Sequence, residues 1–267
     1  MPLEEIKSGG PRKDGIPAID KPRFEQLNGG IATGWAARID NAEPVISLVI
    51  GSEARAYPLR ILIWHEIAND VVGGTPVAVT YCPLCNASLV FERTVENRVL
   101  DFSTTGKLRN SDLVMYDRQT ESWWQQFGGD AIAGIMSGKQ LRLVPSRLES
   151  FGRFRQRFPN GKVLIPNNPA ARDYGRNPYV GYDVSGPFLY DGSLPEGVEP
   201  MERVIALPSS GGVGAALRAG YNRLTLINYG IHRVDAADVR PLGPLAARSA
   251  TAPYPVALHR IRIAPAS

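Results

Sequence analysis

The chain has 267 residues, of which 43% are hydrophobic and 21% charged, and its formal net charge is +4. These proportions are typical of a folded protein and exclude a largely disordered chain. Its 27 glycines and 22 prolines predict many turns between short elements, and no apolar run is long enough for a membrane-spanning helix. The arginines near the C-terminus are scattered rather than clustered on one face, which argues against nucleic-acid binding.

Residues 57–72 are expected to form a helix that begins at Pro58, because proline suits the first helical turn. Gly73-Gly74 would end it. An apolar stripe at helical spacing supports this helix and comprises Leu59, Leu62, Ile63 and Ile67. His65 lies beside the stripe, in a polar group with Trp64, Glu66, Asn69 and Asp70. An imidazole close to a thiol can take its proton or bind a metal ion with it, so His65 is a candidate for either role; the alternative is a histidine satisfied in the core.

Three strands are expected after this helix, because β-branched residues are concentrated there. They are predicted at residues 75–81, 87–93 and 99–102, with a turn at Glu96-Asn97 before the third. The loop between the first two strands contains the chain's only cysteines, Cys82 and Cys85. Two thiols at this spacing can close a local disulfide or bind one metal ion, whereas the alternative is a pair of buried apolar thiols.

Redox and metal chemistry both remain open for the cysteine pair. In a thiol oxidoreductase one cysteine would attack the substrate, the other would resolve the mixed disulfide, and His65 would act as base. Convention makes Cys82 the attacking residue, but the segment after Cys85 lacks the helix of a thioredoxin-type site. In a metal site Cys82, Cys85 and His65 would be the ligands, for copper first and zinc second. A closed zinc site needs four ligands, which these residues do not supply.

Residues 113–116 and 123–125 are expected to form a hairpin around a turn at residues 117–120. The candidate substrate-binding residues lie before this hairpin or beside the cysteines, and are Tyr81, Arg109, Asn110 and Asp112. A third function class, a non-catalytic binding module, would use the loop around Arg109 together with Trp123.

The C-terminal half is expected to contain one short helix and a long loop. Ser146 and Glu149 form a capping-box pattern before a helix carrying Phe151, Phe154 and Phe158. Residues 167–200 are rich in Gly, Pro and Asn and predict a long loop, a kind of segment that is often functional. Residues 202–207 resemble residues 43–48, which suggests the start of a second unit; chance similarity is the alternative.

Several motifs together resemble those of one bacterial family, domain of unknown function 3179. The motifs occupy residues 64–67, 80–86, 106–113 and 116–120, and the resemblance runs from about Gly15 to Leu207. The family brings no settled activity with it. Some members have selenocysteine at a cysteine position of the pair, which implies chemistry at Cys82 or Cys85. Many members look exported, which implies a periplasmic or extracellular protein, although the first ten residues do not read as a signal peptide.

The sequence therefore predicts a β-rich α+β fold, a twisted sheet or partly closed barrel with a few short packing helices. Residues 1–207 would form the core domain, and residues 208–267 a divergent tail rich in Ala, Arg and Pro. The expected function is thiol-based redox chemistry on a small-molecule or thiol/disulfide substrate. The alternatives are a copper or zinc protein and a non-catalytic binding module.

Overall fold

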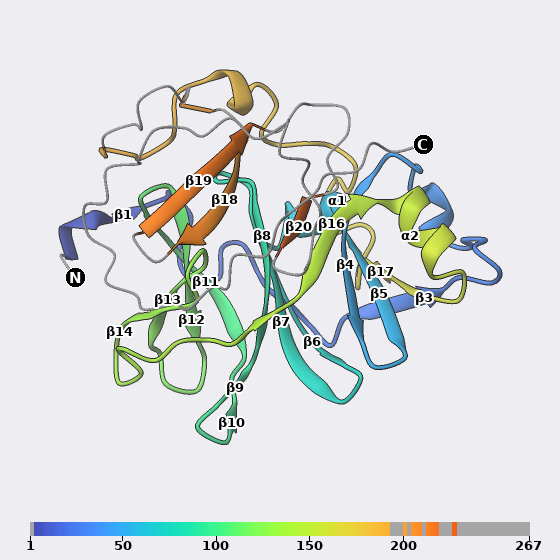
Figure 1. The fold of residues 1–267 in the computed structure, drawn as a ribbon, viewed down its shortest axis with the longest axis horizontal. Coiled ribbons are helices and arrows are strands. Elements are labelled where there is room, and N and C mark those ends of the chain that lie inside the picture. Colours follow the sequence, from blue (N-terminus) through green and yellow to red (C-terminus); the bar gives the residue numbers. More distant parts are fainter. Residues whose placement is uncertain (1–2, 193–199, 202–203, 210–211, 219–225, 229–267) are drawn as a thin grey trace.

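The computed structural model describes residues 3–192, 200–201, 204–209, 212–218 and 226–228 (Figure 1). Within these ranges the only α-helices are α1 (Leu59–Leu62) and α2 (Phe151–Arg157). Single 3₁₀ turns also occur there: η1 (Leu3–Glu5), η2 (Ala36–Arg38) and η3 (Tyr182–Val184). Neither helix is long and apolar enough to cross a membrane. Strands dominate the described residues, which confirms the expected β-rich fold.

A central sheet has the strand order β15-β8-β7-β6-β2. Its strands are β2 (Ile19–Asp20), β6 (Ile67–Val72), β7 (Thr75–Cys82), β8 (Ala87–Glu92) and β15 (Leu143–Val144). Neighbouring strands are antiparallel except for the parallel pair β2 and β6. The long strands β6, β7 and β8 form one meander, so local connections build the middle of the sheet.

A second sheet, of order β20-β16-β4-β5-β17-β3, packs against one face of the central sheet. Its strands are β3 (Arg23–Gln26), β4 (Pro44–Ile50), β5 (Glu53–Pro58), β16 (Ser146–Ser150), β17 (Lys162–Ile165) and β20 (Leu226–Asn228). Between the two sheets Ile46, Leu48 and Tyr57 meet Val77 and Val79 in one core. The opposite face of the second sheet is covered by α2, through Phe151 and Phe154, and by η2.

A third sheet, of order β1-β11-β12-β13-β14, packs against the other face of the central sheet. Its strands are β1 (Ile6–Ser8), β11 (Phe102–Arg109), β12 (Asp112–Asp117), β13 (Trp123–Gln125) and β14 (Ala131–Ala133). Phe102, Met115 and Trp124 are fully buried in the core that joins it to the central sheet. Two separate hairpins complete the described strands: β9 (Thr94–Val95) with β10 (Arg98–Val99), and β18 (Val204–Ser209) with β19 (Gly212–Arg218).

Strand β7 contributes side chains to both cores, because successive residues of a strand point to opposite faces of the sheet. Val77, Val79 and Tyr81 belong to the core facing the second sheet. Ala78 and Cys82 belong to the core facing the third sheet. This alternation directs the Cys82 side chain toward β12.

The helix expected at residues 57–72 is wrong beyond its first turn. α1 ends at Leu62, and Ile67–Val72 is strand β6, paired antiparallel with β7 from Ile67↔Thr80 to Val72↔Thr75. Glu66, between them, has a φ of 60°, a left-handed conformation that interrupts the helix. Gly73 and Gly74, with φ of 54° and 78°, form the tight turn between β6 and β7 instead of a helix end.

The other predicted elements have mixed outcomes. The strands at residues 75–81, 87–93, 113–116 and 123–125 are confirmed as β7, β8, β12 and β13, while β11 begins only at Phe102. The turn at Glu96-Asn97 joins β9 and β10.

The helix expected to open at Ser146 is wrong in its start, because Ser146–Ser150 is strand β16 and the hydroxyl of Ser150 caps α2 by accepting a hydrogen bond from Arg153 N. The described part of the long loop, residues 167–192, contains only η3. Most of residues 208–267, and with them the proposed tail, lie outside the described residues.

Candidate functional site

The two cysteines lie where β7 turns into β8. Cys82 is the last residue of β7, and a four-residue turn that ends at Asn86 leads into β8. The turn requires a left-handed residue, which Asn86 provides with a φ of 47°. Both cysteines are free thiols: Cys82 is 1% exposed, whereas Cys85 is partly exposed. Cys85 is therefore the more exposed of the two cysteines.

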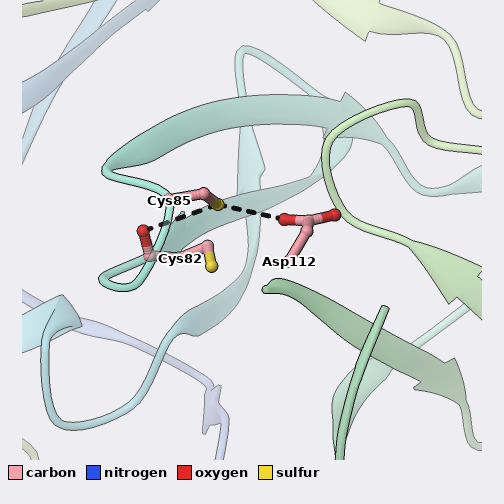
Figure 2. A group of neighbouring side chains, drawn as sticks. All are labelled: Cys82, Cys85 and Asp112. Carbon is pink, nitrogen blue, oxygen red and sulfur yellow. Dashed lines mark hydrogen bonds between the residues drawn. The ribbon is translucent and has the colours of Figure 1, made fainter. Parts of the chain in front are cut away.

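A third functional group, the Asp112 carboxylate, reaches the thiols from the third sheet. Asp112 opens β12 directly after the turn at Asn110-Ser111, whose φ values of 52° and 66° close the β11–β12 hairpin. Its Oδ1 lies 3.1 Å from Cys85 Sγ, and the ligand atoms of Cys82, Cys85 and Asp112 all lie within 4.8 Å of one another (Figure 2). The site therefore spans the seam between two sheets.

Hydrogen bonds fix the Asp112 carboxylate in this position. The backbone N–H of Phe127 donates to Oδ2 at 2.9 Å, and the Gln125 side chain donates to the same oxygen. Burial raises the pKa of Asp112, while the hydrogen bonds from Phe127, Gln125 and Cys85 oppose that rise because they favour the charged form. Asp112 is thus a buried carboxyl group that can accept a proton from Cys85.

The Cys85 thiol holds its proton firmly. Its pKa is raised well above the ordinary value by the hydrogen bond to Cys82, by burial and by the nearby Asp112 charge. Cys85 is therefore a thiol, not a preformed thiolate, at neutral pH. A reaction at this sulfur needs an adjacent base, and Asp112 is within hydrogen-bond reach.

Glu66 and Tyr179 add two titratable groups around the site. Glu66 is 7% exposed, and burial together with the Asp112 charge raises its pKa to about 8. Tyr179 comes from the long loop after β17, and burial raises its pKa to about 12, with the charges of Glu66 and Cys82 acting in the same direction. The long loop thus carries a phenol whose protonation responds to the charges of Glu66 and Cys82.

The structure does not bring His65 to the thiols. Its Nδ1 and the Pro17 carbonyl oxygen are 2.8 Å apart, and its Nε2 is 2.8 Å from the Tyr174 hydroxyl. The ring also stacks on Tyr174, with centroids 5.8 Å apart. Both ring nitrogens are occupied, and burial lowers the pKa of His65. A cavity of about 300 Å³ adjoins this pair and is also lined by Asn167 and Asn168.

The predicted substrate-binding residues separate into different roles. Asp112 lies at the thiols, and Asn110 forms the turn before it. Arg109 pairs with Glu5 at 2.7 Å and also donates to Gln125, so it supports the residue that holds Asp112. Tyr81 points into the opposite core, and its hydroxyl lies 3.3 Å from Asn86 Oδ1 in the cysteine turn.

The group Cys82, Cys85 and Asp112 supplies two sulfur donors and one oxygen donor for a metal ion. Among the described residues no other cluster of three His, Cys, Asp or Glu side chains meets the same spacing. His65, which we expected as the third ligand, is not part of the group. Asp112 takes its place in the geometry, and an oxygen donor beside two thiolates suits zinc better than copper(I).

A second cavity is lined by none of the three residues Cys82, Cys85 and Asp112. It has a volume of about 610 Å³ and is lined by charged residues, among them Asp20, Arg55, Asp70, Arg93, Asp101 and Arg118. These side chains form ion pairs with one another: Arg55 with Asp70, Arg93 with Asp101 and Arg118 with Asp20. The cavity is a salt-bridged junction between sheets rather than part of the thiol site.

Sequence reasoning identified the cysteines and Asp112 but assigned no role to Glu66, Gln125 or Tyr179. Glu66 carried a signal, because it belongs to the polar group around His65. Gln125 and Tyr179 carried none, since each meets the site only through the fold of a distant segment.

Comparisons with known proteins agree with the motif resemblance. The sequence profile of the family described as Protein of unknown function (DUF3179) matches residues 13–231, which is most of the chain and extends beyond Leu207, where we expected the resemblance to end. Searches of curated proteins and of solved structures each found no match. The chain belongs to the DUF3179 family of proteins of unknown function.

Proposed function

We propose that the protein exchanges electrons with thiol or disulfide substrates through Cys82 and Cys85, with Asp112 as the proton acceptor. The observation that carries this proposal is the 3.1 Å contact between Cys85 Sγ and Asp112 Oδ1. A thiol with a raised pKa becomes a strong nucleophile once a base removes its proton, and the carboxylate stands at hydrogen-bond distance.

The reduction of a substrate disulfide proceeds in two steps. Asp112 takes the proton of Cys85, the Cys85 sulfur attacks one substrate sulfur, and the substrate S–S bond breaks; Asp112 passes the proton to the leaving thiolate. Asp112 then takes the proton of Cys82, whose sulfur attacks Cys85 in the mixed disulfide. A Cys82–Cys85 disulfide forms, and the second substrate thiolate leaves and is protonated. Two electrons pass from the protein dithiol to the substrate, and a substrate dithiol reverses both steps.

The exposure of the two sulfurs favours Cys85 as the attacking residue and Cys82 as the resolving one. Cys85 is partly exposed, whereas Cys82 is 1% exposed and needs to reach only Cys85. This assignment reverses the convention for cysteine pairs of this spacing, in which the first cysteine attacks.

Incubating the reduced protein with glutathione disulfide tests the proposal. Cys82→Ser should accumulate a mixed disulfide on Cys85, identified by mass spectrometry, whereas Cys85→Ser should not react. Asp112→Asn should slow the exchange by about 100-fold near neutral pH, the usual contribution of a positioned base. Asp130→Asn, which changes another partly buried carboxyl directly before β14, is the matched control and should leave the rate unchanged. A Cys85→Ser protein that reacts as fast as the wild type would refute the assignment.

A metal site is the second candidate, because three donors of suitable type lie within 4.8 Å of one another. Elemental analysis of protein purified without chelators distinguishes the two candidates. Stoichiometric zinc or copper that is lost in both Cys82→Ser and Asp112→Asn supports ligation. Metal-free protein with a reversible disulfide supports the redox function.

A further inference from the structure

The cavity of about 610 Å³ has buried polar side chains in its wall. Arg55, Asn69, Asp70 and Arg93 line it, and each is less than one tenth exposed. Taking charged groups out of water costs free energy even when they are paired, so apolar residues would close a purely structural junction at lower cost. The volume lies within the range of small-molecule binding sites. The charges on the wall therefore indicate which kind of molecule the cavity can hold.

Each carboxylate oxygen on the cavity wall already accepts a hydrogen bond from the protein. Asp20 accepts through one oxygen at 2.9 Å and through the other at 2.8 Å. Asp101 accepts through its two oxygens at 2.6 and 2.9 Å, and Asp70 through both of its oxygens at 2.6 Å. Because each of these carboxylates is also paired with an arginine, the wall does not favour a cation as the ligand.

Lys21 leaves the cavity wall with one excess positive charge. The three aspartates pair one to one with the three arginines of the wall. Lys21 is the remaining cationic residue, and no carboxylate of the described residues forms an ion pair with its ammonium group. Glu53, the second carboxylate at Arg55, also pairs with Lys162 and so does not change this balance. A ligand that neutralises Lys21 is therefore an anion.

The backbone at Lys21 is strained for a residue of this type. Its φ of 51° is a left-handed conformation, which glycine adopts with less strain. Pro22 follows directly, and the residue before a proline is normally extended. Conformations of this kind concentrate at functional sites and ligand clamps. Lysine at this position carries a conformational cost, which an ammonium group needed for binding would explain.

Apolar side chains complete the cavity wall. Pro22, Phe24 and Val71 line it beside the charged groups. An inorganic anion would leave these side chains uncovered, whereas an organic anion would bury them. We propose that the cavity binds a small organic anion, whose carboxylate pairs with Lys21 and whose apolar part packs against the three apolar side chains. This inference is independent of the proposed redox function.

Isothermal titration calorimetry of the full chain with benzoate tests the inference. Benzoate combines a carboxylate with an apolar ring, benzamide has the same shape without the charge, and inorganic phosphate has the charge without the ring. Benzoate should bind at a single site, and the other two probes should bind more weakly by about 10-fold or more. Benzamide or phosphate binding as tightly as benzoate would overturn the inference, as would the absence of benzoate binding at millimolar concentrations.

Variants at Lys21 locate the binding site. Lys21→Met should weaken benzoate binding by about 10-fold, the loss of one charge-assisted contact, whereas Lys21→Arg keeps the charge and should retain binding. Lys21→Gly removes the ammonium group but suits the left-handed backbone, so it should bind weakly while its thermal unfolding curve stays close to that of the wild type. Lys139→Met, which removes a lysine paired with Glu96 outside the cavity wall, is the matched control and should bind normally. Unchanged affinity in Lys21→Met and Lys21→Gly would overturn the inference.

A negative charge on the apolar part of the wall should repel the ligand. Val71→Asp should weaken benzoate binding at least as strongly as Lys21→Met does. Val49→Asp introduces the same charge at an exposed valine of β4 that does not line the cavity, and its affinity should equal that of the wild type. Equal affinities of these two variants would overturn the inference, since the bound benzoate would then lie elsewhere on the protein.

Discussion

The pKa values of two glutamates, Glu66 and Glu53, are shifted in opposite directions. Each shift can be tested by measuring the free energy of unfolding against pH. Burial raises the pKa of Glu66 to about 8. Glu53 accepts hydrogen bonds from Gly73 N, Lys162 and Arg55, and these lower its pKa to about 2. The environment of each carboxyl, rather than its residue type, determines which protonation state the fold favours.

For Glu66 the folded protein retains a proton that the unfolded chain releases near its ordinary pKa of 4.5. The free energy of unfolding should therefore fall as pH rises from 4.5 to about 8. Glu66→Gln has no carboxyl group to ionise, so its free energy of unfolding does not fall for this reason. The difference in free energy of unfolding between this variant and the wild type should therefore grow across that pH range, by about 2–4 kcal/mol in favour of the variant. Urea unfolding at a series of pH values measures the difference, and a constant difference would contradict the burial of an acid at this position.

For Glu53 the sign is reversed. The folded state favours the ionised carboxylate, so its stabilisation is complete above pH 4.5 and is lost as pH falls toward about 2. Glu53→Gln should lower the free energy of unfolding at neutral pH by about 1 kcal/mol. The same urea series should show the two proteins converging in acid. A gap that widens as pH falls would contradict the ion-pair network around Glu53.

At the scale of elements, the sequence predicted strands better than helices. β7, β8, β12 and β13 were predicted because β-branched residues are concentrated in them. The segment after α1 was misassigned because Leu59, Leu62, Ile63 and Ile67 fall at helical spacing by coincidence, although Ile67 begins a strand. Gly73-Gly74 is compatible with both a helix end and a hairpin turn, and only the pairing of β6 with β7 decides between them.

The start of α2 gives a prediction with an internal control. Ser150 caps the helix by accepting a hydrogen bond from Arg153 N, so Ser150→Ala should lower the free energy of unfolding by about 1 kcal/mol. Ser146 has a buried hydroxyl without a hydrogen-bond partner among the described residues. Ser146→Ala should therefore be neutral or slightly stabilising. Denaturant unfolding compares the two variants. Equal losses in the free energy of unfolding would favour Ser146 as the residue at which the helix begins.

The candidate site was only partly predictable for a similar reason. Cys82 and Cys85 are visible from their spacing, and Asp112 was identified as a polar residue near a turn. Its contact with Cys85 depends on how the third sheet packs against the central one, which no local pattern encodes. His65 was misleading because closeness in sequence to the cysteine strand does not place its ring on the same side.

At the scale of the whole molecule, a buried ion pair joins two of the three large sheets. Arg55 on β5 donates to Asp70 on β6 at 2.6 Å, and the Tyr57 hydroxyl donates to the same carboxylate at 2.6 Å. Asp70 and Arg55 are both less than one tenth exposed. Removing one partner leaves the other charge buried without compensation, which is far more costly than losing an exposed pair.

Asp70→Asn should accordingly lower the free energy of unfolding by about 3–5 kcal/mol. The double variant Arg55→Met/Asp70→Leu removes both charges and should cost less than the sum of the single changes. Glu92→Gln, which breaks a pair with the exposed Arg142, should cost less than about 1 kcal/mol. Chemical denaturation of the wild type, Arg55→Met, Asp70→Leu and the double variant gives the coupling energy, and additive losses would show that the pair does not stabilise the contact between the sheets.

The cysteines and Asp112 come from different sheets, so the alignment of the sheets sets their separation. A substitution that lets one layer slide slightly over its neighbour would slow proton removal from Cys85 without touching any reacting atom. The reactivity of the Cys85 thiol would then report how closely the two sheets are aligned, because it would decline before the protein begins to unfold.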